Sequence, residues 1–144
     1  MAVAHILKVK GRNVVTARPD DAIEGVVNDL AVNKIGAIVV TDGDGVIKGI
    51  VSERDVVRHL ALEGAKLLQK KVSTIMTADV HTCRDGDSEQ ELMALMTARR
   101  IRHLPVVHGG KLAGMISIGD VVKHRIEAIE REAEDMKAYI STAG

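Results

Sequence analysis

Apolar residues recur at helical spacing in two stretches of the chain. Between Asp21 and Ala31 they fall at positions i, i+3 and i+4, and between Asp87 and Arg99 the same spacing returns. An apolar stripe of this kind predicts an amphipathic helix, and acidic residues in the first turn favour a helix because they face the positive end of its dipole. The pattern therefore predicts one such helix in each half of the chain.

Each of these helices is followed by two short apolar runs. Residues 37–40 and 46–51 enclose a turn of alternating aspartate and glycine, and residues 104–107 and 111–116 enclose a turn with two glycines. Two apolar runs around such a turn predict a β-hairpin.

Further elements flank each hairpin. A helix is predicted after it, at 52–64 and from 117 onward, and a short strand is predicted before the first helix, at 14–16 and 80–82. The order strand, helix, strand, strand, helix therefore occurs twice. This order indicates a mixed α/β (α+β) fold.

The two halves also share sequence. The stretch Gly49-Ile-Val-Ser-Glu-Arg-Asp-Val-Val-Arg-His59 returns 65 residues later as Gly114-Met-Ile-Ser-Ile-Gly-Asp-Val-Val-Lys-His124, and upstream of it the matching residues lie 66 apart. We interpret the chain as two repeats, 1–72 and 73–144, with residues 64–73 as the link. A unit of this size buries too little surface to be stable alone, so we expect the repeats to pack against each other.

The second repeat ends in an extended helix. Apolar residues continue at helical spacing from Ile126 to Ile140, and Glu127 forms an i, i+4 pair with Arg131. The apolar face suits a partner helix.

Composition and charge narrow the choice of partners. Lys and Arg number 20 and so do Asp and Glu, which gives no electrostatic reason to expect nucleic acid or an acidic membrane. Aromatic residues make up 1%, too few for the stacking that single-strand binders use. One cysteine, Cys83, cannot form an internal disulfide, and no apolar run reaches 18 residues. We therefore expect a soluble, cytoplasmic protein, for which small polar partners remain open.

The duplicated pattern Gly-h-h-Ser-x-x-Asp, where h is apolar, lies between a hairpin and a helix in both repeats. Together with Ile101-Arg-His-Leu-Pro-Val-Val107 it resembles a tandem pair of cystathionine-β-synthase (CBS) domains over almost the whole chain. The resemblance implies pseudo-twofold symmetry and clefts between the repeats that bind AMP, ADP, ATP, NAD(H) or S-adenosylmethionine. It also implies a regulatory sensor that signals to an unidentified effector protein, with no catalysis and no catalytic cofactor. Modules of this kind pair through their helices into a flat dimer, so we expect a homodimer, which the apolar face of the last helix supports.

Two aspartates hold the place that a ribose site needs. A carboxylate fixed at a helix start accepts hydrogen bonds from both vicinal hydroxyls, and Asp55 and Asp120 lie there. Three residues earlier, Ser52 and Ser117 offer hydroxyls and helix amides to phosphate oxygens.

The family arrangement completes each cleft with residues of the other repeat. For the cleft at Asp55 we expect Ser52, Asp55, Ile50, Arg54, Arg84, Ile101, Arg102 and His103. Because guanidinium groups match phosphate oxygens, this cleft suits a phosphate-bearing ligand. For the cleft at Asp120 we expect Ser117, Asp120, Met115, Arg18, Ile23, Ile35, Gly36 and Ala37. It carries fewer charges, so we expect it to be weaker, empty or selective for a less charged ligand.

A structural interpretation accounts for the same residues. Serine followed three positions later by an acidic residue is also a helix capping box, which leaves a closed, ligand-free interaction module as the alternative. Redox chemistry at Cys83 is a further alternative, because the neighbouring Arg84 would lower the pKa of a thiol. The histidines are scattered without metal-ligand spacing, so no metal site is expected.

Overall fold

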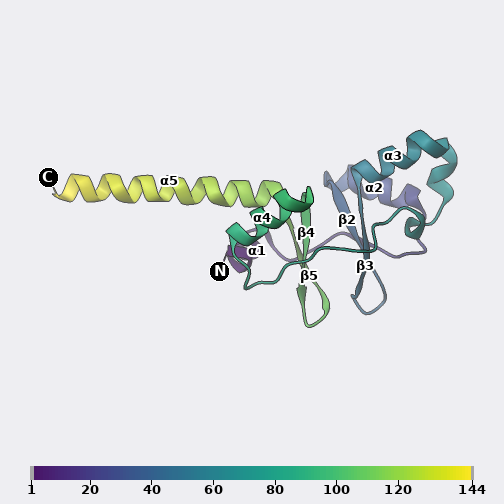
Figure 1. Cartoon of the computed structure of the whole chain (residues 1–144), viewed down its shortest axis with the longest axis horizontal. Coiled ribbons are helices and arrows are strands. Elements are labelled where there is room, and N and C mark those ends of the chain that lie inside the picture. The colour runs from purple at the N-terminus through teal and green to yellow at the C-terminus, as the bar shows by residue number, and fades with distance from the viewer. Residues whose placement is uncertain (1, 144) are drawn as a thin grey trace.

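The hairpins predicted in both halves of the chain form, and each belongs to a small sheet of its own. In the computed structural model, which describes residues 2–143, the two sheets stand side by side with helices around them (Figure 1). Each sheet contributes to a separate hydrophobic core. The molecule thus has two lobes, one for each repeat, which confirms the predicted mixed α+β fold.

The sheet of the first lobe has three strands. β1 (Thr16–Ala17) pairs in parallel with β2 (Ala37–Thr41), which pairs antiparallel with β3 (Ile47–Ser52). Every residue of β2 is buried, which explains the uninterrupted apolar run in its sequence.

The sheet of the second lobe has two strands, β4 (His103–His108) and β5 (Lys111–Ser117), paired antiparallel. The short strand predicted at 80–82 is wrong by one residue and reduces to a single parallel bridge between Cys83 and Val106. The amide of Cys83 donates to the carbonyl of Pro105, and the carbonyl of Cys83 accepts from the amide of Val107, both at 2.9 Å. These two bonds fix the bridge at Cys83.

Four helices follow the predicted order: α2 (Ile23–Asn33), α3 (Glu53–Glu63), α4 (Glu89–Arg99) and α5 (Ile118–Ala143). α2 and α4 begin two residues later than predicted, because Asp21 and Asp87 do not belong to their first turns. Instead each carboxylate accepts a 2.8 Å hydrogen bond from a backbone amide three residues earlier, at Arg18 and at Arg84. The acidic residues therefore shape the turn before the helix.

The first repeat begins with an additional helix, which packs against the second lobe. α1 (Ala2–Lys10) buries Val3, Ile6 and Leu7 in the core of the second lobe. The methyl groups of Leu7 lie so close to Gly114 that a Cβ atom there would be 2.9 Å from Cδ2. Gly114 is thus required by the close approach of α1 to β5.

The link between the repeats is structured. Residues 64–69 and 72–74 form two short 3-10 helices, η1 (Gly64–Gln69) and η2 (Val72–Thr74). Leu67 and Val72 are completely buried in the core of the first lobe. The link is therefore an integral part of that core.

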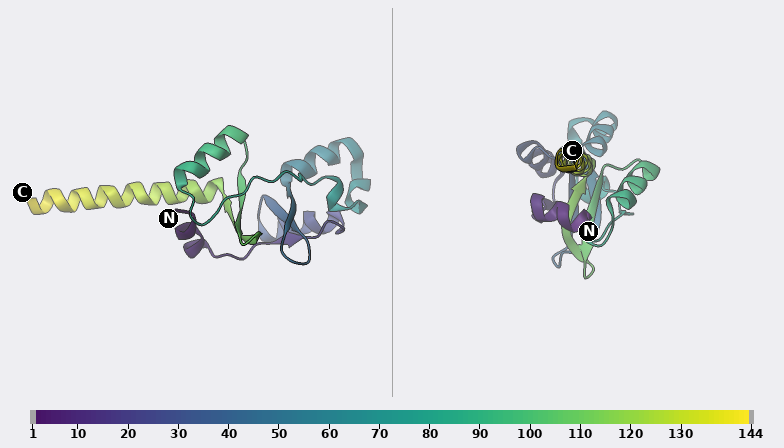
Figure 2. Two further views of the ribbon diagram at one scale, coloured as in Figure 1. Left: turned by 60° about the horizontal axis from the view of Figure 1, so that its bottom comes forward. Right: turned by 90° about the vertical axis from the view of Figure 1, so that its left-hand side faces the viewer.

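α5 extends well beyond the second lobe as a straight arm (Figures 1 and 2). Its first turns pack against α1, α4 and β5, where Val121 is buried, and its later turns contact no other element closely. Across residues 2–143 no helix has the combined length and hydrophobicity needed to span a bilayer.

Candidate functional site

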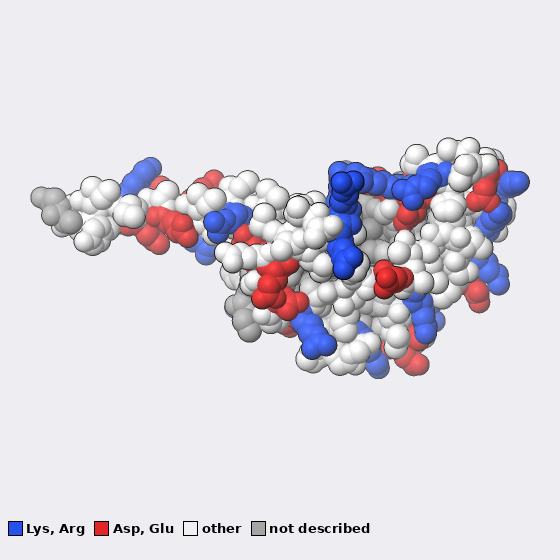
Figure 3. Space-filling model, in the orientation of Figure 1, with Lys and Arg blue, Asp and Glu red and all other residues white. Residues whose placement is uncertain are grey.

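A cavity of about 410 Å³ lies between the two lobes, within the range of small-molecule sites. Residues of both repeats line it: Gly36, Ala37, Ile50, Ser52, Glu53, Arg54, Asp55, Thr77, Asp79, Val80, His81, Arg99, Arg100, Ile101, Arg102 and His103. Basic side chains gather where the lobes meet (Figure 3). The cavity therefore exists only because the two repeats pack together.

The end of β3 and the start of α3 form the floor of this cavity. Ser52 caps α3: its Oγ accepts from the amide of Asp55 at 3.2 Å, and its own amide donates to Oδ2 of Asp55 at 2.9 Å. The capping box expected at this pair is thus confirmed. Among the hydrogen bonds of residues 2–143 none involves Oδ1 of Asp55, so this oxygen can accept from a ligand.

Four arginines surround the floor: Arg54, Arg99, Arg100 and Arg102 come from the helix α3, the end of α4 and the approach to β4. They outnumber the three acidic residues of the lining, which are Glu53, Asp55 and Asp79. Arg100 closes α4 in the left-handed region, with φ of 54°, a conformation that is strained for arginine. The excess of guanidinium groups makes the cavity suitable for a phosphate.

His103 joins the two lobes at the wall of the cavity. Its ring lies against Gly36, where a Cβ atom would be 3.2 Å from Cε1. Burial lowers the pKa of His103, and the charges of Lys10 and Arg102 lower it further against the opposing effect of Asp120 and Glu53. The ring is therefore neutral near pH 7, with one nitrogen that donates and one that accepts.

Seven of the eight residues expected around Asp55 line the cavity. Arg84 does not: it is exposed, and its backbone amide is bound to Asp87. Sequence reasoning missed Glu53, Thr77, Asp79, Val80, His81, Arg99 and Arg100. The basic pair directly before Ile101 was a usable signal. The segment that begins at Thr77 could not have been recognised from the sequence, because it reaches the cavity through backbone pairing of Thr77 with Ile50.

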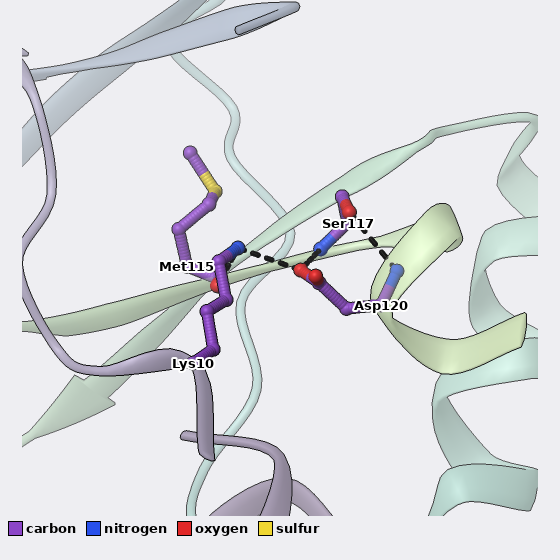
Figure 4. Close-up of polar contacts among 4 residues, drawn as sticks. All are labelled: Lys10, Met115, Ser117 and Asp120. Atoms are coloured by element: carbon purple, nitrogen blue, oxygen red, sulfur yellow. Dashed lines mark hydrogen bonds and ion pairs between the residues drawn. The ribbon is translucent and has the colours of Figure 1, made fainter. Parts of the chain in front are cut away.

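Where the second cleft is expected, the Asp120 carboxylate forms an ion pair with a lysine. Nζ of Lys10, the last residue of α1, lies 2.6 Å from Oδ2 of Asp120 and donates to the carbonyl of Met115 at 2.9 Å (Figure 4). Ser117 caps α5 as Ser52 caps α3. Its amide donates to Oδ2 of Asp120 at 2.9 Å, and its Oγ accepts from the amide of Asp120 at 3.2 Å. Burial raises the pKa of Asp120, but Lys10 and the Ser117 amide outweigh it and hold the pKa below its usual value.

The repeat relationship explains the difference. At the shift of 66 residues, Lys10 corresponds to Met76, whose side chain packs against Gly49 and carries no charge. Asp55 accordingly takes part in none of the ion pairs recorded for residues 2–143, whereas Asp120 does. One carboxylate is open and the other is neutralised from within the chain.

The other residues expected around Asp120 lie in the first lobe and between the lobes. Gly36 and Ala37 line the cavity at Asp55, between the two lobes. Ile23 is completely buried in the core of the first lobe, and Ile35 packs against that core. Arg18 is exposed, with its guanidinium beside the turn at Gly43.

Replacing Lys10 by methionine is expected to make the two clefts more alike. The ion pair is partly exposed, so its loss changes affinity at Asp120 by about 1 kcal/mol, roughly fivefold. We expect a second, weaker binding event when this variant is titrated with AMP in a calorimeter, and a rise in the pKa of Asp120 measured by NMR. Lys8→Met, at an exposed lysine of the same helix, is the control and should behave as the wild type. A single binding event in all three proteins would refute the role given to Lys10.

Cys83 is not a reactive thiol. Burial raises its pKa to about 12, and Asp87 and Asp85 add to this effect. The side chain is 3% exposed in the core of the second lobe. The proposed effect of Arg84 is therefore wrong, and redox chemistry at Cys83 finds no support in this structure.

Comparison with known proteins agrees with this architecture. The family model described as "CBS domain" matches the chain twice, over residues 6–62 and 72–127. The crystal structure of the CBS-domain protein ATU1752 from Agrobacterium tumefaciens has a TM-score of 0.83 and 50% identity, and the match covers 87% of this chain and 99% of that one. The structure of CBSX2 in complex with AMP has a TM-score of 0.70 and 26% identity, and the match covers 81% of this chain and 90% of that one.

Curated relatives share the same region. The mitochondrial CBS domain-containing protein CBSX3 of Arabidopsis thaliana is 31% identical over 146 residues, which cover 96% of this chain and 71% of that protein. The inosine-5'-monophosphate dehydrogenase of Methanocaldococcus jannaschii is 33% identical over 143 residues, but this chain spans only 27% of its length. The matched part is thus the CBS region of a larger enzyme. With two matched domains over most of its length, the chain belongs to the CBS-domain family.

Proposed function

We propose that this chain is a regulatory module that binds an adenosine-containing nucleotide in the cavity at Asp55. The observation that carries the proposal is the combination of one open carboxylate and four arginines in a single cavity of about 410 Å³. The carboxylate suits the hydroxyls of a ribose, and the arginines suit phosphate. The partly buried Ile50 and Ile101 provide apolar walls for the base.

AMP is the first ligand to test. CBSX2, which shares the fold and 26% of the sequence, was crystallised with AMP. The same chemistry accommodates ADP, ATP and NAD(H), which add phosphate at the end where the arginines lie. We propose binding without turnover.

The response to the ligand is proposed to pass to a separate effector protein. We further propose that the chain acts as a homodimer and in the cytoplasm, where a buried free thiol such as Cys83 stays reduced.

The second candidate function is a ligand-free interaction module. The complete capping box at Ser52 and Asp55 favours it, because both residues already have a structural role. The two candidates differ in one measurable respect: only the first requires the cavity to bind a nucleotide.

Mass spectrometry of the small molecules released on denaturing the purified protein is the first test. A stoichiometric adenosine compound would support the proposal and identify the ligand. The second test is thermal unfolding with AMP, ADP, ATP, NAD⁺ and NADH. At 100 times its dissociation constant a ligand adds about 2.7 kcal/mol to the free energy of unfolding, which raises Tm by roughly 10 °C.

The outcomes separate the two candidates. A released nucleotide, or a rise in Tm with one of the five ligands, excludes the closed module. A clean spectrum together with an unchanged Tm across all five ligands would overturn the nucleotide proposal. ATP incubated with Mg²⁺ and the protein should remain intact, whereas release of phosphate would reveal an enzyme.

A further inference from the structure

The α5 arm presents a continuous apolar stripe to solvent. Its members are spaced alternately four and three residues apart: Val122, Ile126, Ile129, Ala133, Met136 and Ile140. Ile126 is 51% exposed, Met136 60% and Ile140 64%. Three isoleucines and a methionine on an arm that its own chain does not cover are an unusual exposure for a lone helix.

The alternating spacing is that of a heptad repeat. With Ile126 placed at position a, the stripe occupies a and d positions over three heptads, which is the seam of a coiled coil. α5 packs on the second lobe with another side, which carries the buried Val121 and His124. Nδ1 of His124 lies 2.8 Å from Oε2 of Glu89. The seam therefore remains accessible while α5 is held by its own lobe.

Charged residues flank the seam in a complementary order. The g positions hold Arg125 and Glu132, and the e positions hold Glu130 and Lys137. In a parallel pair of helices each g residue meets the e residue five positions further along the partner. Arg125 then meets Glu130 of the other copy, and Glu132 meets Lys137, so the pair gains four attractive contacts.

The existing contacts of these residues leave them available. Arg125 lies 3.8 Å from Glu89 with half of its side chain exposed, and Lys137 lies 3.9 Å from Glu134, with both of these side chains more than three-quarters exposed. Such loose, solvent-exposed pairs contribute little and are readily exchanged for others.

The antiparallel alternative fits less well. When two antiparallel copies align so that all six apolar positions of the stripe pair, Glu130 and Glu132 each face their own counterpart in the partner. This alignment brings like charges together on both flanks of the seam. Charge complementarity thus selects the parallel arrangement.

We propose that α5 pairs with α5 of a second copy as a parallel, in-register coiled coil over residues 122–142. This gives the homodimer a defined interface and places the two nucleotide cavities on opposite sides of one twofold axis. The inference rests on α5 alone and does not depend on what the cavity binds.

Disulfide cross-linking tests the arrangement. Ala133 is an exposed a position, and in a parallel in-register pair it faces itself across the seam, within the Cα separation of about 4.4–6.8 Å that a disulfide spans. Mild oxidation of Ala133→Cys should give a covalent dimer on a non-reducing gel. The matched control is Ala138→Cys, at the outward-facing f position, which should stay uncrosslinked. The native Cys83 is buried and contributes no background.

Equal cross-linking at both positions, or none at Ala133→Cys, would overturn the proposal, because in an antiparallel pair position 133 faces a d position instead.

A charge reversal gives an independent check. Glu132→Lys should raise the dissociation constant of the dimer several-fold by sedimentation equilibrium, and Glu132→Lys combined with Lys137→Glu should restore it. If the double variant dissociates like the single one, the g and e residues do not pair as proposed.

Nucleotide binding should be unchanged in all of these variants, so the failure of one proposal leaves the other standing.

Discussion

Asp55→Ala is expected to lower the affinity of the cavity for AMP by at least roughly a hundredfold. In the proposed site the Asp55 carboxylate would accept hydrogen bonds from both ribose hydroxyls, and charge-assisted hydrogen bonds contribute about 1.5–3 kcal/mol each. Loss of both corresponds to about 3–6 kcal/mol, or a factor of at least 100 in dissociation constant. Titration calorimetry with AMP measures this directly.

The same substitution also removes a helix cap, so stability and binding must be separated. Asp55→Ala removes the carboxylate to which the Ser52 amide donates, and this loss lowers the free energy of unfolding by about 1 kcal/mol. Ser88→Ala is the matched control: Ser88 caps α4 by accepting from Glu91 at 3.1 Å and does not line the cavity. Both variants should lose similar stability, but only Asp55→Ala should lose binding. Normal affinity for AMP in Asp55→Ala would remove Asp55 from the proposed site.

The local parts of the fold could be predicted from sequence. Helices α2 and α4 follow from apolar spacing, the hairpins from glycine-rich turns, and the floor of the cavity from the repeated Ser-x-x-Asp. Each of these signals lies within a dozen residues, where periodicity and turn chemistry act directly. The duplication then indicated that the two floors occupy related places.

The unequal state of the two clefts could not be predicted in the same way. It depends on α1, which belongs to the first repeat but packs on the second lobe. It therefore depends on contacts across more than a hundred residues, such as that of Lys10 with Asp120. The sequence around residues 2–10 shows no sign of which lobe it joins. Arg84 illustrates the same limit: it lies at the expected place in the sequence, but its side chain is not part of the cavity lining.

Leu7→Ala is expected to destabilise the protein by about 3 kcal/mol, a large share of the roughly 5–15 kcal/mol typical of a folded domain. Leu7 is 1% exposed and fills the space beside Gly114. Since that glycine has no side chain to move into the gap, truncation leaves a cavity between α1 and β5. Thermal unfolding should show a fall in Tm of about 10 °C.

Val9→Ala provides the matched comparison within α1. Val9 is 72% exposed, so its truncation should change the free energy of unfolding by no more than about 0.5 kcal/mol. If Leu7→Ala is as mild as Val9→Ala, α1 is not part of the second core. If the large difference is found, α1 is anchored by Leu7, and Lys10 is then held at Asp120 by the packing of the whole helix. Leu7→Ala should in that case weaken the pairing of Lys10 with Asp120 as well, and the rise in the pKa of Asp120 expected for Lys10→Met should appear in part in Leu7→Ala.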